Sequence, residues 1–186
     1  PVGAGESAAN GGRYAASTNL RRRSCPATVA DCNRCLTARA KASRWPEALL
    51  LLEEMRREGP LPDAITCNAA LSACSRARRP QQALELLQVM LSWGLVPDVI
   101  TYSTAISACE RGELPDRALS LLEEMQEKGI SPDVIVYNSA ISACSKEGRW
   151  QGALGLLGEM RRSGIEPDTI SYSSVICACS RGDRPE

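Results

Sequence analysis

Three kinds of side chain recur along this chain at a spacing suited to holding an extended, charged ligand with flat rings. In each period of 35 residues, as measured from Pro62 to Pro97, an aliphatic residue is followed by a small hydrogen-bonding residue and then by a cation. The aliphatic residues are Ile65, Ile100, Ile135 and Ile170, with Ala30 at the corresponding place nearest the N-terminus. The hydrogen-bonding residues are Asn33, Asn68, Ser103, Asn138 and Ser173, and the cations are Lys41, Arg76, Arg111, Lys146 and Arg181. Such a set suits a nucleic acid, because the aliphatic residue can pack on a base, the polar residue can read its edge, and the cation can hold a phosphate.

A plainer interpretation accounts for part of this pattern. A Lys or Arg in the last turn of a helix is stabilised by the helix dipole by about 0.3–1 kcal/mol, with no ligand involved. That explains the cations. It does not explain why an aliphatic residue such as Ile100 stands beside a polar residue on a helix face that the core does not use. The pattern as a whole favours a binding groove.

The residues that carry this chemistry belong to a sequence repeat. Landmark residues return every 35 positions, as the step from Gly94 to Gly129 shows. They are the Pro-Asp pairs at Pro62, Pro97, Pro132 and Pro167, the glycines Gly59, Gly94, Gly129 and Gly164, and the methionines Met55, Met90, Met125 and Met160. A period between about 20 and 50 residues is typical of solenoids and propellers.

The apolar spacing inside one period predicts two helices. Apolar residues fall three or four positions apart from Val99 onward, and again from Pro115 onward. Pro115 suits the first turn of the second helix, and Gly129 suits a left-handed C-terminal cap. Two helices per period cannot bury their apolar faces alone, so neighbouring periods must stack. The predicted fold is therefore all-α, a right-handed α-solenoid of helix-turn-helix repeats with a concave and a convex face.

The repeats divide the chain into units. Residues 29–63 form repeat 1, 64–98 repeat 2, 99–133 repeat 3, 134–168 repeat 4, and 169–186 the start of repeat 5. Residues 1–28 lie outside the pattern and are rich in Gly, Ala, Ser and Arg, which indicates a flexible linker. A decayed second helix and an organelle transit peptide are the alternatives. Because the chain opens on Pro1 and stops where a second helix is due, we expect a longer parent chain with protein partners of its own.

The composition argues against several classes of function. The chain has no histidine, which is the commonest general base and metal ligand. We expect no enzymatic activity, metal ion, cofactor or small-molecule substrate. No apolar run approaches the length of a membrane span, so we expect no membrane partner either. Lys and Arg together number 22, as do Asp and Glu, so nucleic-acid binding must depend on where the cations lie and not on net charge.

The cysteines and tryptophans have simpler explanations as packing residues. One cysteine per repeat recurs on the apolar side of the first helix, where we expect buried free thiols: Cys74, Cys109, Cys144 and Cys179. The pair Cys32 and Cys35 has metal-ligand spacing but no matching second pair, so we interpret it as core. Trp45 and Trp150 begin second helices, and we expect them to pack within the fold and not to stack on bases.

The repeat resembles the pentatricopeptide repeat in its plain 35-residue form over residues 29–186, and the likeness lies in the phrases VITYSTAISAC, ALSLLEEMQEKGISPD and DVIVYNSAISAC. The resemblance implies a non-catalytic, sequence-specific reader of single-stranded RNA, one base per repeat, that supports RNA processing or expression in a chloroplast or mitochondrion. It also implies that the second residue of each repeat packs against bases and that the fifth and thirty-fifth residues select the base. The selecting pairs are then Asn33 with Asp63, Asn68 with Asp98, Ser103 with Asp133, and Asn138 with Asp168.

These aspartates have a second interpretation. Each stands just before a first helix, where an Asp N-cap contributes about 1 kcal/mol to stability, and the two roles are compatible.

The edges of the bases predict which base each repeat prefers. A carboxylate only accepts hydrogen bonds, so it favours U and G, whose ring nitrogens carry a hydrogen. The longer Asn leaves room for a pyrimidine and the shorter Ser admits a purine, in agreement with what the resemblance implies. The resemblance also implies that the array runs from the protein's N-terminus toward the RNA 3′ end, so repeats 1 to 4 predict 5′-UUGU-3′. A helical scaffold for protein segments stays open as the alternative function.

Overall fold

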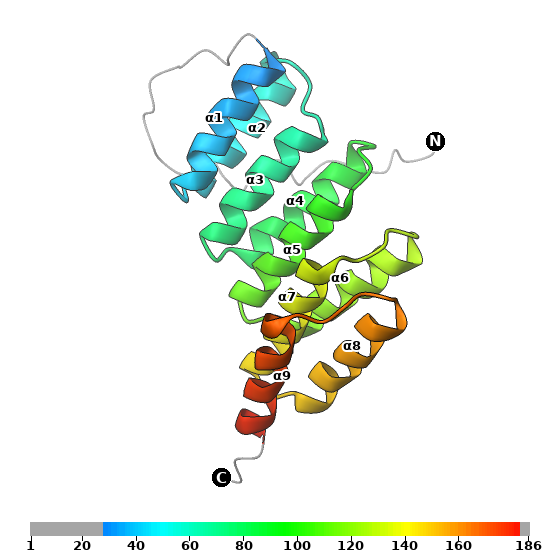
Figure 1. The fold of residues 1–186 in the computed structure, drawn as a ribbon. Helices are drawn as coiled ribbons and strands as arrows, with labels where there is room; N and C mark the ends of the chain where they lie inside the picture. The colour runs from blue at the N-terminus through cyan, green and yellow to red at the C-terminus, as the bar shows by residue number, and fades with distance from the viewer. Residues whose placement is uncertain (1–27, 183–186) are drawn as a thin grey trace, which may run out of the picture.

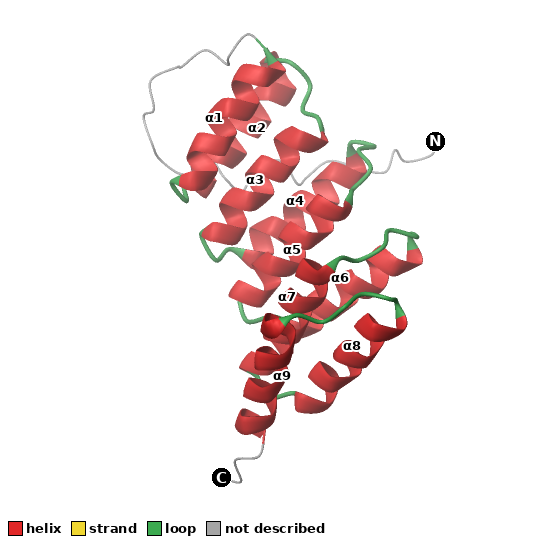
Figure 2. Ribbon diagram, viewed as in Figure 1, coloured by secondary structure: helices red, strands yellow, loops and turns green. Residues whose placement is uncertain are grey.

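The structure is a computed structural model that describes residues 28–182. Every regular element in that range is a helix (Figure 2), as the apolar spacing predicted. The helices are α1 (Val29–Lys41), α2 (Trp45–Glu58), α3 (Ala64–Arg76), α4 (Pro80–Ser92), α5 (Val99–Arg111), α6 (Pro115–Glu127), α7 (Val134–Lys146), α8 (Trp150–Arg162) and α9 (Thr169–Gly182). The segment expected to be a linker lies outside the described residues apart from Thr28, as do residues 183–186 of repeat 5.

The helices form two layers. Figure 1 shows α1, α3, α5, α7 and α9 in one row, with α2, α4, α6 and α8 in a second row behind it and to its right. We call the first set the inner layer and the second the outer layer. Successive inner helices pack closely against one another, whereas the backbone of each outer helix in the described part of the chain approaches inner helices only. Elements on the inside of a curve lie closer together than those on the outside, so the inner layer lines the concave side. The chain is an all-α helical-repeat solenoid, as predicted.

The core lies between the two layers, and the landmark residues of the outer helices fill it. Ala118 and Met125 of α6 are fully buried, and so are their counterparts in the other outer helices. Those counterparts are Ala48, Ala83, Ala153, Met55, Met90 and Met160. A small residue lets two helices approach closely, and the flexible Met side chain fills the remaining gap. Packing therefore explains why these two residues recur in each repeat.

Two buried tyrosines join the layers. The hydroxyl of Tyr102 on α5 donates to Glu124 Oε1 on α6 at 2.9 Å, and the hydroxyl of Tyr137 on α7 donates to Glu159 Oε1 on α8 at 3.0 Å. Lys128 also donates to the Tyr102 hydroxyl at 2.8 Å. A buried tyrosine keeps its hydroxyl paired in this way, so these contacts fix the distance between an inner helix and the outer helix that follows it.

Glycine ends most of the outer helices in a left-handed conformation. Gly129 has φ +70°, and the Ile130 N–H donates to the Met125 carbonyl at 3.0 Å, which is a Schellman cap. The prediction for Gly129 is therefore confirmed. Gly59 differs, with φ −116°, because Pro60 follows it and the residue before a proline is restricted to extended backbone.

The packing interpretation is confirmed for most of the cysteines and for Trp45, but it is wrong for Trp150, which is 38 % exposed, and Cys179 is only half-buried. Cys74, Cys109 and Cys144 are fully buried free thiols, and burial raises the pKa of Cys109 to about 11. Cys32 is buried in the core cluster nearest the N-terminus. Trp45 packs against that cluster and the next one.

Candidate nucleic-acid interface

An exposed apolar row runs along the inner layer. It consists of the second residue of α3, α5, α7 and α9. These residues are 58–66 % exposed: Ile65, Ile100, Ile135 and Ile170. Single exposed aliphatic residues are common, but four in register on one face offer a ligand an apolar contact per repeat.

The aspartate at the end of each repeat caps the next inner helix. Asp63, Asp98 and Asp133 are the N-caps of α3, α5 and α7, and their side chains accept from the N–H three residues on at 2.7 Å, 2.8 Å and 2.9 Å. Asp168 accepts from the Ser171 N–H in the same way, at 2.9 Å. The N-cap interpretation of these residues is therefore confirmed.

A hydrogen bond joins the fifth residue to the thirty-fifth where the fifth is asparagine. Asn68 Nδ2 donates to Asp98 Oδ1 at 3.2 Å, and Asn138 Nδ2 donates to Asp168 Oδ1 at 3.1 Å. The Asn33 side chain also lies beside the Asp63 carboxylate. The fold thus joins two of these pairs by hydrogen bonds across 30 positions of sequence. Asn138 Nδ2 also donates to Asp168 Oδ2 at 3.2 Å, so an amide donor and a carboxylate acceptor stand next to one another.

The same hydrogen bonds keep the carboxylates ionised. Partial burial works against the charge on Asp98, but hydrogen bonds from the backbone and hydroxyl of Thr101 and from Asn68 outweigh it and lower the pKa of Asp98. For Asp168, the Ser171 N–H is the main cause of a lowered pKa. Carboxylates in this state only accept hydrogen bonds.

The pair formed by Ser103 and Asp133 has a different geometry. Asp133 accepts from the Val136 N–H, but no hydrogen bond joins it to Ser103 within the described residues. A serine side chain is shorter than an asparagine side chain. Repeat 3 therefore lacks the amide that contacts the carboxylate in repeats 2 and 4.

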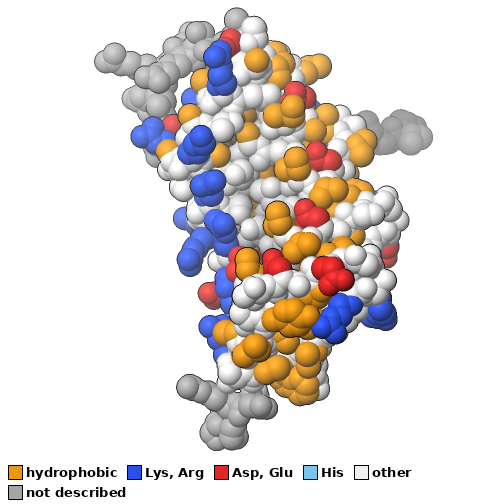
Figure 3. All heavy atoms as spheres, in the orientation of Figure 1, with side chains coloured by type: hydrophobic (Ala, Val, Ile, Leu, Met, Phe, Trp, Pro, Cys, Tyr) orange, Lys and Arg blue, Asp and Glu red, His pale blue; other side chains and the backbone are white. Residues whose placement is uncertain are grey.

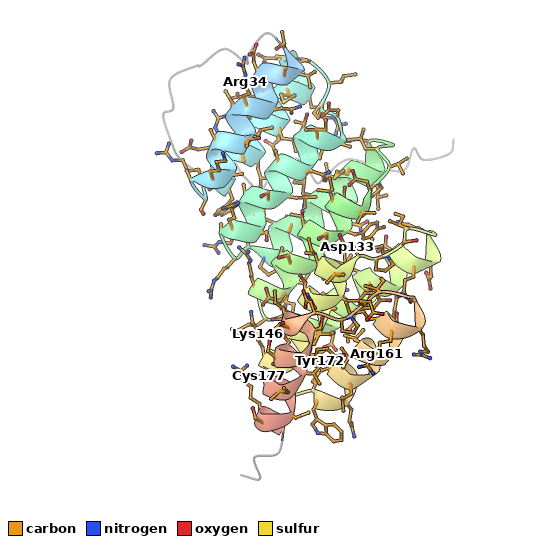
Figure 4. The ribbon with its side chains drawn as sticks, viewed as in Figure 1. Arg34, Asp133, Lys146, Arg161, Tyr172 and Cys177 are labelled. Carbon is orange, nitrogen blue, oxygen red and sulfur yellow. The ribbon has the colours of Figure 1, made fainter. Side chains whose placement is uncertain are left out.

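The cations lie at the opposite ends of the inner helices from the aspartates. Figure 4 labels Asp133 and Lys146 at the two ends of α7. Figure 3 shows Lys and Arg side chains following one edge of this face. The five cations predicted to contact phosphate are exposed and stand in the last turns of their helices: Lys41, Arg76, Arg111, Lys146 and Arg181. We call them the cation row.

Two members of the cation row contact the neighbouring inner helix. Lys146 Nζ lies 2.7 Å from Glu110 Oε1 and donates to the Glu110 main-chain carbonyl at 2.8 Å. Arg181 donates to the Ser145 carbonyl at 3.3 Å. These carbonyls end α5 and α7, where a helix dipole attracts a positive charge. The dipole interpretation therefore holds for these two cations, although the helix concerned is the preceding one and not their own.

Two shallow depressions open on the inner layer among these rows. One, of about 350 Å³, is lined by Asn33, Thr37 and Lys41 on α1. The other, of about 220 Å³, lies between α7 and α9 and is lined in part by Ser173 and Arg181. The predicted stripe of polar and charged residues thus forms part of the wall of each depression.

Sequence reasoning missed the third residue of the inner helices. The Thr101 hydroxyl donates to Asn68 Oδ1 at 2.7 Å, and the Ser171 hydroxyl donates to Asn138 Oδ1 at 2.6 Å. The recurrence of a hydroxyl at this position, which Thr66 shares, was the available signal. These three hydroxyl residues are fully buried, so they lie outside the exposed stripe.

Other chemistry has little support in the described residues. Residues 28–182 hold no group of three or more His, Cys, Asp or Glu side chains able to bind a metal ion. The same range contains no helix that is both long and apolar enough to cross a membrane.

Paired helices stacked at a fixed period define a helical-repeat protein of the solenoid class. A sequence model described as the PPR repeat family matches residues 62–111 and 132–181, and a model of the PPR repeat matches residues 36–60 and 100–130. The chain belongs to the pentatricopeptide repeat family. No curated protein sequence matches it.

Solved structures share the fold. The pentatricopeptide repeat protein PPR10 in complex with an 18-nt psaJ RNA element matches with a TM-score of 0.72 at 32 % identity, over 86 % of this chain and 24 % of that one. PPR10 from maize matches with a TM-score of 0.67 at 34 % identity, over 83 % and 22 %. The PPR domain of Arabidopsis thaliana protein-only RNase P 1, in complex with tRNA, matches with a TM-score of 0.73 at 20 % identity, over 83 % and 81 %, which is a likeness of fold alone. The chain thus spans about a quarter of PPR10.

Proposed function

We propose that the inner layer binds single-stranded RNA in a sequence-specific way, with one base read by each repeat. The reading units are residues 29–63, 64–98, 99–133 and 134–168, and Ser173 belongs to the next unit. The observation that carries the proposal is the hydrogen bond between Asn and Asp at the boundary of successive repeats. This hydrogen bond sets an amide and a carboxylate side by side on the layer that carries the exposed isoleucines, which supports a reading role for the pair.

The chemistry of the bases suits this arrangement. A base that packs on the isoleucine of a repeat turns its edge toward the Asn–Asp pair. Uracil has a carbonyl oxygen beside a ring N–H, so it can accept from the amide and donate to the carboxylate. Guanine is larger and also has a ring N–H, so it suits the repeat in which the shorter Ser103 is paired with Asp133. The cation row then follows the phosphates and supplies affinity without selecting bases.

The relatives support this proposal in part. PPR10, which is 32 % identical over the matched region, has been solved with a single RNA element bound. We extend RNA binding to this chain on that ground and on the repeat geometry, and we propose a non-catalytic role in RNA processing or expression. On the family resemblance we place this role in a chloroplast or mitochondrion.

Selection from a random pool of single-stranded RNA tests the proposal. We expect 5′-UUGU-3′ to be enriched. In a plot of log binding constant against log salt concentration, the selected RNA should give a slope of about −3, to which each phosphate contact contributes about −0.7. The double variant Asn68→Ala, Asn138→Ala is a suitable control for base reading. It removes two of the proposed reading side chains, and neither of them caps a helix. If no motif is enriched, and the chain binds an apolar helical peptide with little salt dependence, the exposed isoleucine row serves a protein scaffold and the RNA proposal is wrong.

A further inference from the structure

A buried hydroxyl from the next repeat holds the asparagine that faces the proposed base. Thr101 is fully buried, and its hydroxyl donates to Asn68 Oδ1 at 2.7 Å. The same hydroxyl lies 2.8 Å from Asp98 Oδ1. A hydroxyl has one hydrogen, so Thr101 shares it between the two oxygens, and its contact with the neutral asparagine is as close as its contact with the carboxylate.

The boundary between repeats 4 and 5 repeats this arrangement with a different hydroxyl residue. Ser171 is fully buried and donates to Asn138 Oδ1 at 2.6 Å, whereas its distance to Asp168 Oδ1 is 3.0 Å. The contact therefore depends on the hydroxyl group and is made by Thr and Ser alike.

The amide of Asn68 is fixed at both ends as a result. Its nitrogen donates to Asp98, and its oxygen accepts from Thr101. A reversed amide would set its oxygen against the carboxylate, and two acceptors repel one another. The carbonyl oxygen is thus directed into the repeat boundary, and the second N–H of the amide is the group left for a ligand.

This orientation distinguishes the two pyrimidines. Uracil offers a carbonyl acceptor beside its ring N–H, and it matches an outward N–H next to a carboxylate. Cytosine offers an amino donor beside a ring acceptor. To accept from that amino group, the asparagine would have to turn its oxygen outward and leave the buried hydroxyl without its acceptor. Loss of a buried hydrogen bond makes this rotation unfavourable.

The other two boundaries differ in ways that serve as internal comparisons. Val136 has the place of Thr101 at the boundary after the repeat that carries Ser103. This boundary therefore has neither an asparagine amide nor a hydroxyl to hold one. At the first boundary the Thr66 hydroxyl donates to Asp63 at 2.6 Å, and Asn33 Oδ1 is buried with no hydrogen-bond partner. We expect the base read by repeat 1 to be selected less strictly than those read by repeats 2 and 4.

We propose that Thr101 and Ser171 are positioning residues that set base specificity, because they hold the preceding asparagine amide in the orientation that accepts uracil and rejects cytosine. This inference rests on the proposed function, since it concerns how the same site selects its base. It adds a third residue, from the following repeat, to the pair that reads each base.

The test compares Thr101→Val and Thr101→Ser. Valine keeps the shape of threonine without the hydroxyl, and Val136 shows that an inner helix accepts valine at this place. Binding is measured to oligonucleotides that carry 5′-UUGU-3′, 5′-UCGU-3′ or 5′-UUGC-3′ between adenosine flanks. For Thr101→Val we expect the preference for U over C at the second base to fall by roughly two- to tenfold, the worth of one hydrogen bond, with the fourth base unaffected. Thr101→Ser should restore the wild-type ratio.

Ser171→Ala is the matched variant and should relax the fourth base alone. If Thr101→Val lowers affinity for all three RNAs equally and leaves the ratio of U to C unchanged, the residue is structural only and the inference is wrong, while the proposed function stands. If the wild-type chain does not prefer 5′-UUGU-3′, the proposed function fails, and the inference fails with it.

Discussion

Glu110 on α5 forms an ion pair with Lys146 on α7, with Oε1 and Nζ 2.7 Å apart. Ser142 also donates to Glu110 Oε1, at 3.0 Å. The repeats on either side carry Ser75 and Ser145 in the place of Glu110. An acid among the cations offsets the charge that a phosphate would meet, so we expect the cation row to be weakest at this point.

Replacing that acid should strengthen RNA binding. Glu110→Ser frees Lys146 for a phosphate, so the log–log salt slope should become steeper by about 0.7. Glu113→Ser is the control, since it removes one negative charge close to Glu110. Serine is accepted at this place, because Ser43 occupies the equivalent position in repeat 1 with a similar positive φ. Equal effects of the two variants in a salt titration would mean that net charge matters and release of Lys146 does not.

Reversing two cations should weaken binding without changing its sequence preference. Arg76→Glu together with Arg111→Glu should lower affinity for 5′-UUGU-3′ and for an unrelated RNA by the same factor, because phosphate contacts do not select bases. The salt slope should flatten at the same time. A salt slope that stays at the wild-type value would leave these two arginines with a helix-dipole role only.

The third base should follow the residue at position 103. Ser103→Asn extends the side chain toward Asp133 and should change the preferred third base from G to U, with a discrimination of about 1–3 kcal/mol. Because Val136 supplies no hydroxyl, the double variant Ser103→Asn, Val136→Thr should reject C more strongly than the single variant. Competition binding with RNAs that differ only at the third base measures both effects. Identical responses of 5′-UUGU-3′ and 5′-UUUU-3′ to Ser103→Asn would contradict base reading by this residue.

Acid should weaken the N-caps. The pKa of Asp98 is lowered from an ordinary value of 3.8, so its folded-state pKa lies below that of the unfolded chain. Its contribution to stability is therefore present above about pH 4 and is lost as the pH falls through the folded-state value. Asp98→Asn keeps a good cap and should show a flatter dependence of melting temperature on acid pH. Asp98→Ala should cost about 1 kcal/mol at neutral pH, as measured by denaturant unfolding.

The buried thiols should react slowly. The thiolate is the nucleophile, and burial raises the pKa of Cys109 to about 11 and that of Cys74 to about 12. Alkylation at about pH 8 followed by peptide mapping should modify Cys177, which is half-buried, well before either of them. In denaturant the three rates should converge, and equal rates in the folded protein would argue against this core.

The helix order could be predicted from the sequence because it depends on local spacing. The apolar positions from Pro115 to Met125, the Asp98 cap and the Gly129 cap each involve residues within a few positions of one another. Gly59 departs from the pattern for an equally local reason, the proline that follows it. The exposure of Ile100 was also predictable, because the core positions of its helix were already assigned to other residues.

The contacts across repeat boundaries could not be predicted in the same way. Thr101 and Asn68 are 33 positions apart, and Lys146 contacts Glu110 across 36 positions. Their meeting depends on how far successive inner helices are rotated and shifted against one another, which one repeat alone does not determine. For the same reason the cation row was predicted as five equivalent residues, although Lys146 and Arg181 bind the preceding helix.

The contact pattern between the two layers has a mechanical consequence. Within the described residues the inner helices pack directly against one another as a continuous row, whereas the backbones of the outer helices stay apart and meet through side chains, as Gln126 of α6 and Glu159 of α8 do. A change in the curvature of the array can therefore spread the outer helices at the cost of a few side-chain contacts, without separating packed backbones. The inner side is the stiff side of the molecule and the outer side is the compliant one. We expect thermal bending to alter the end-to-end distance of the array while the distance between neighbouring asparagines on the inner layer stays nearly constant.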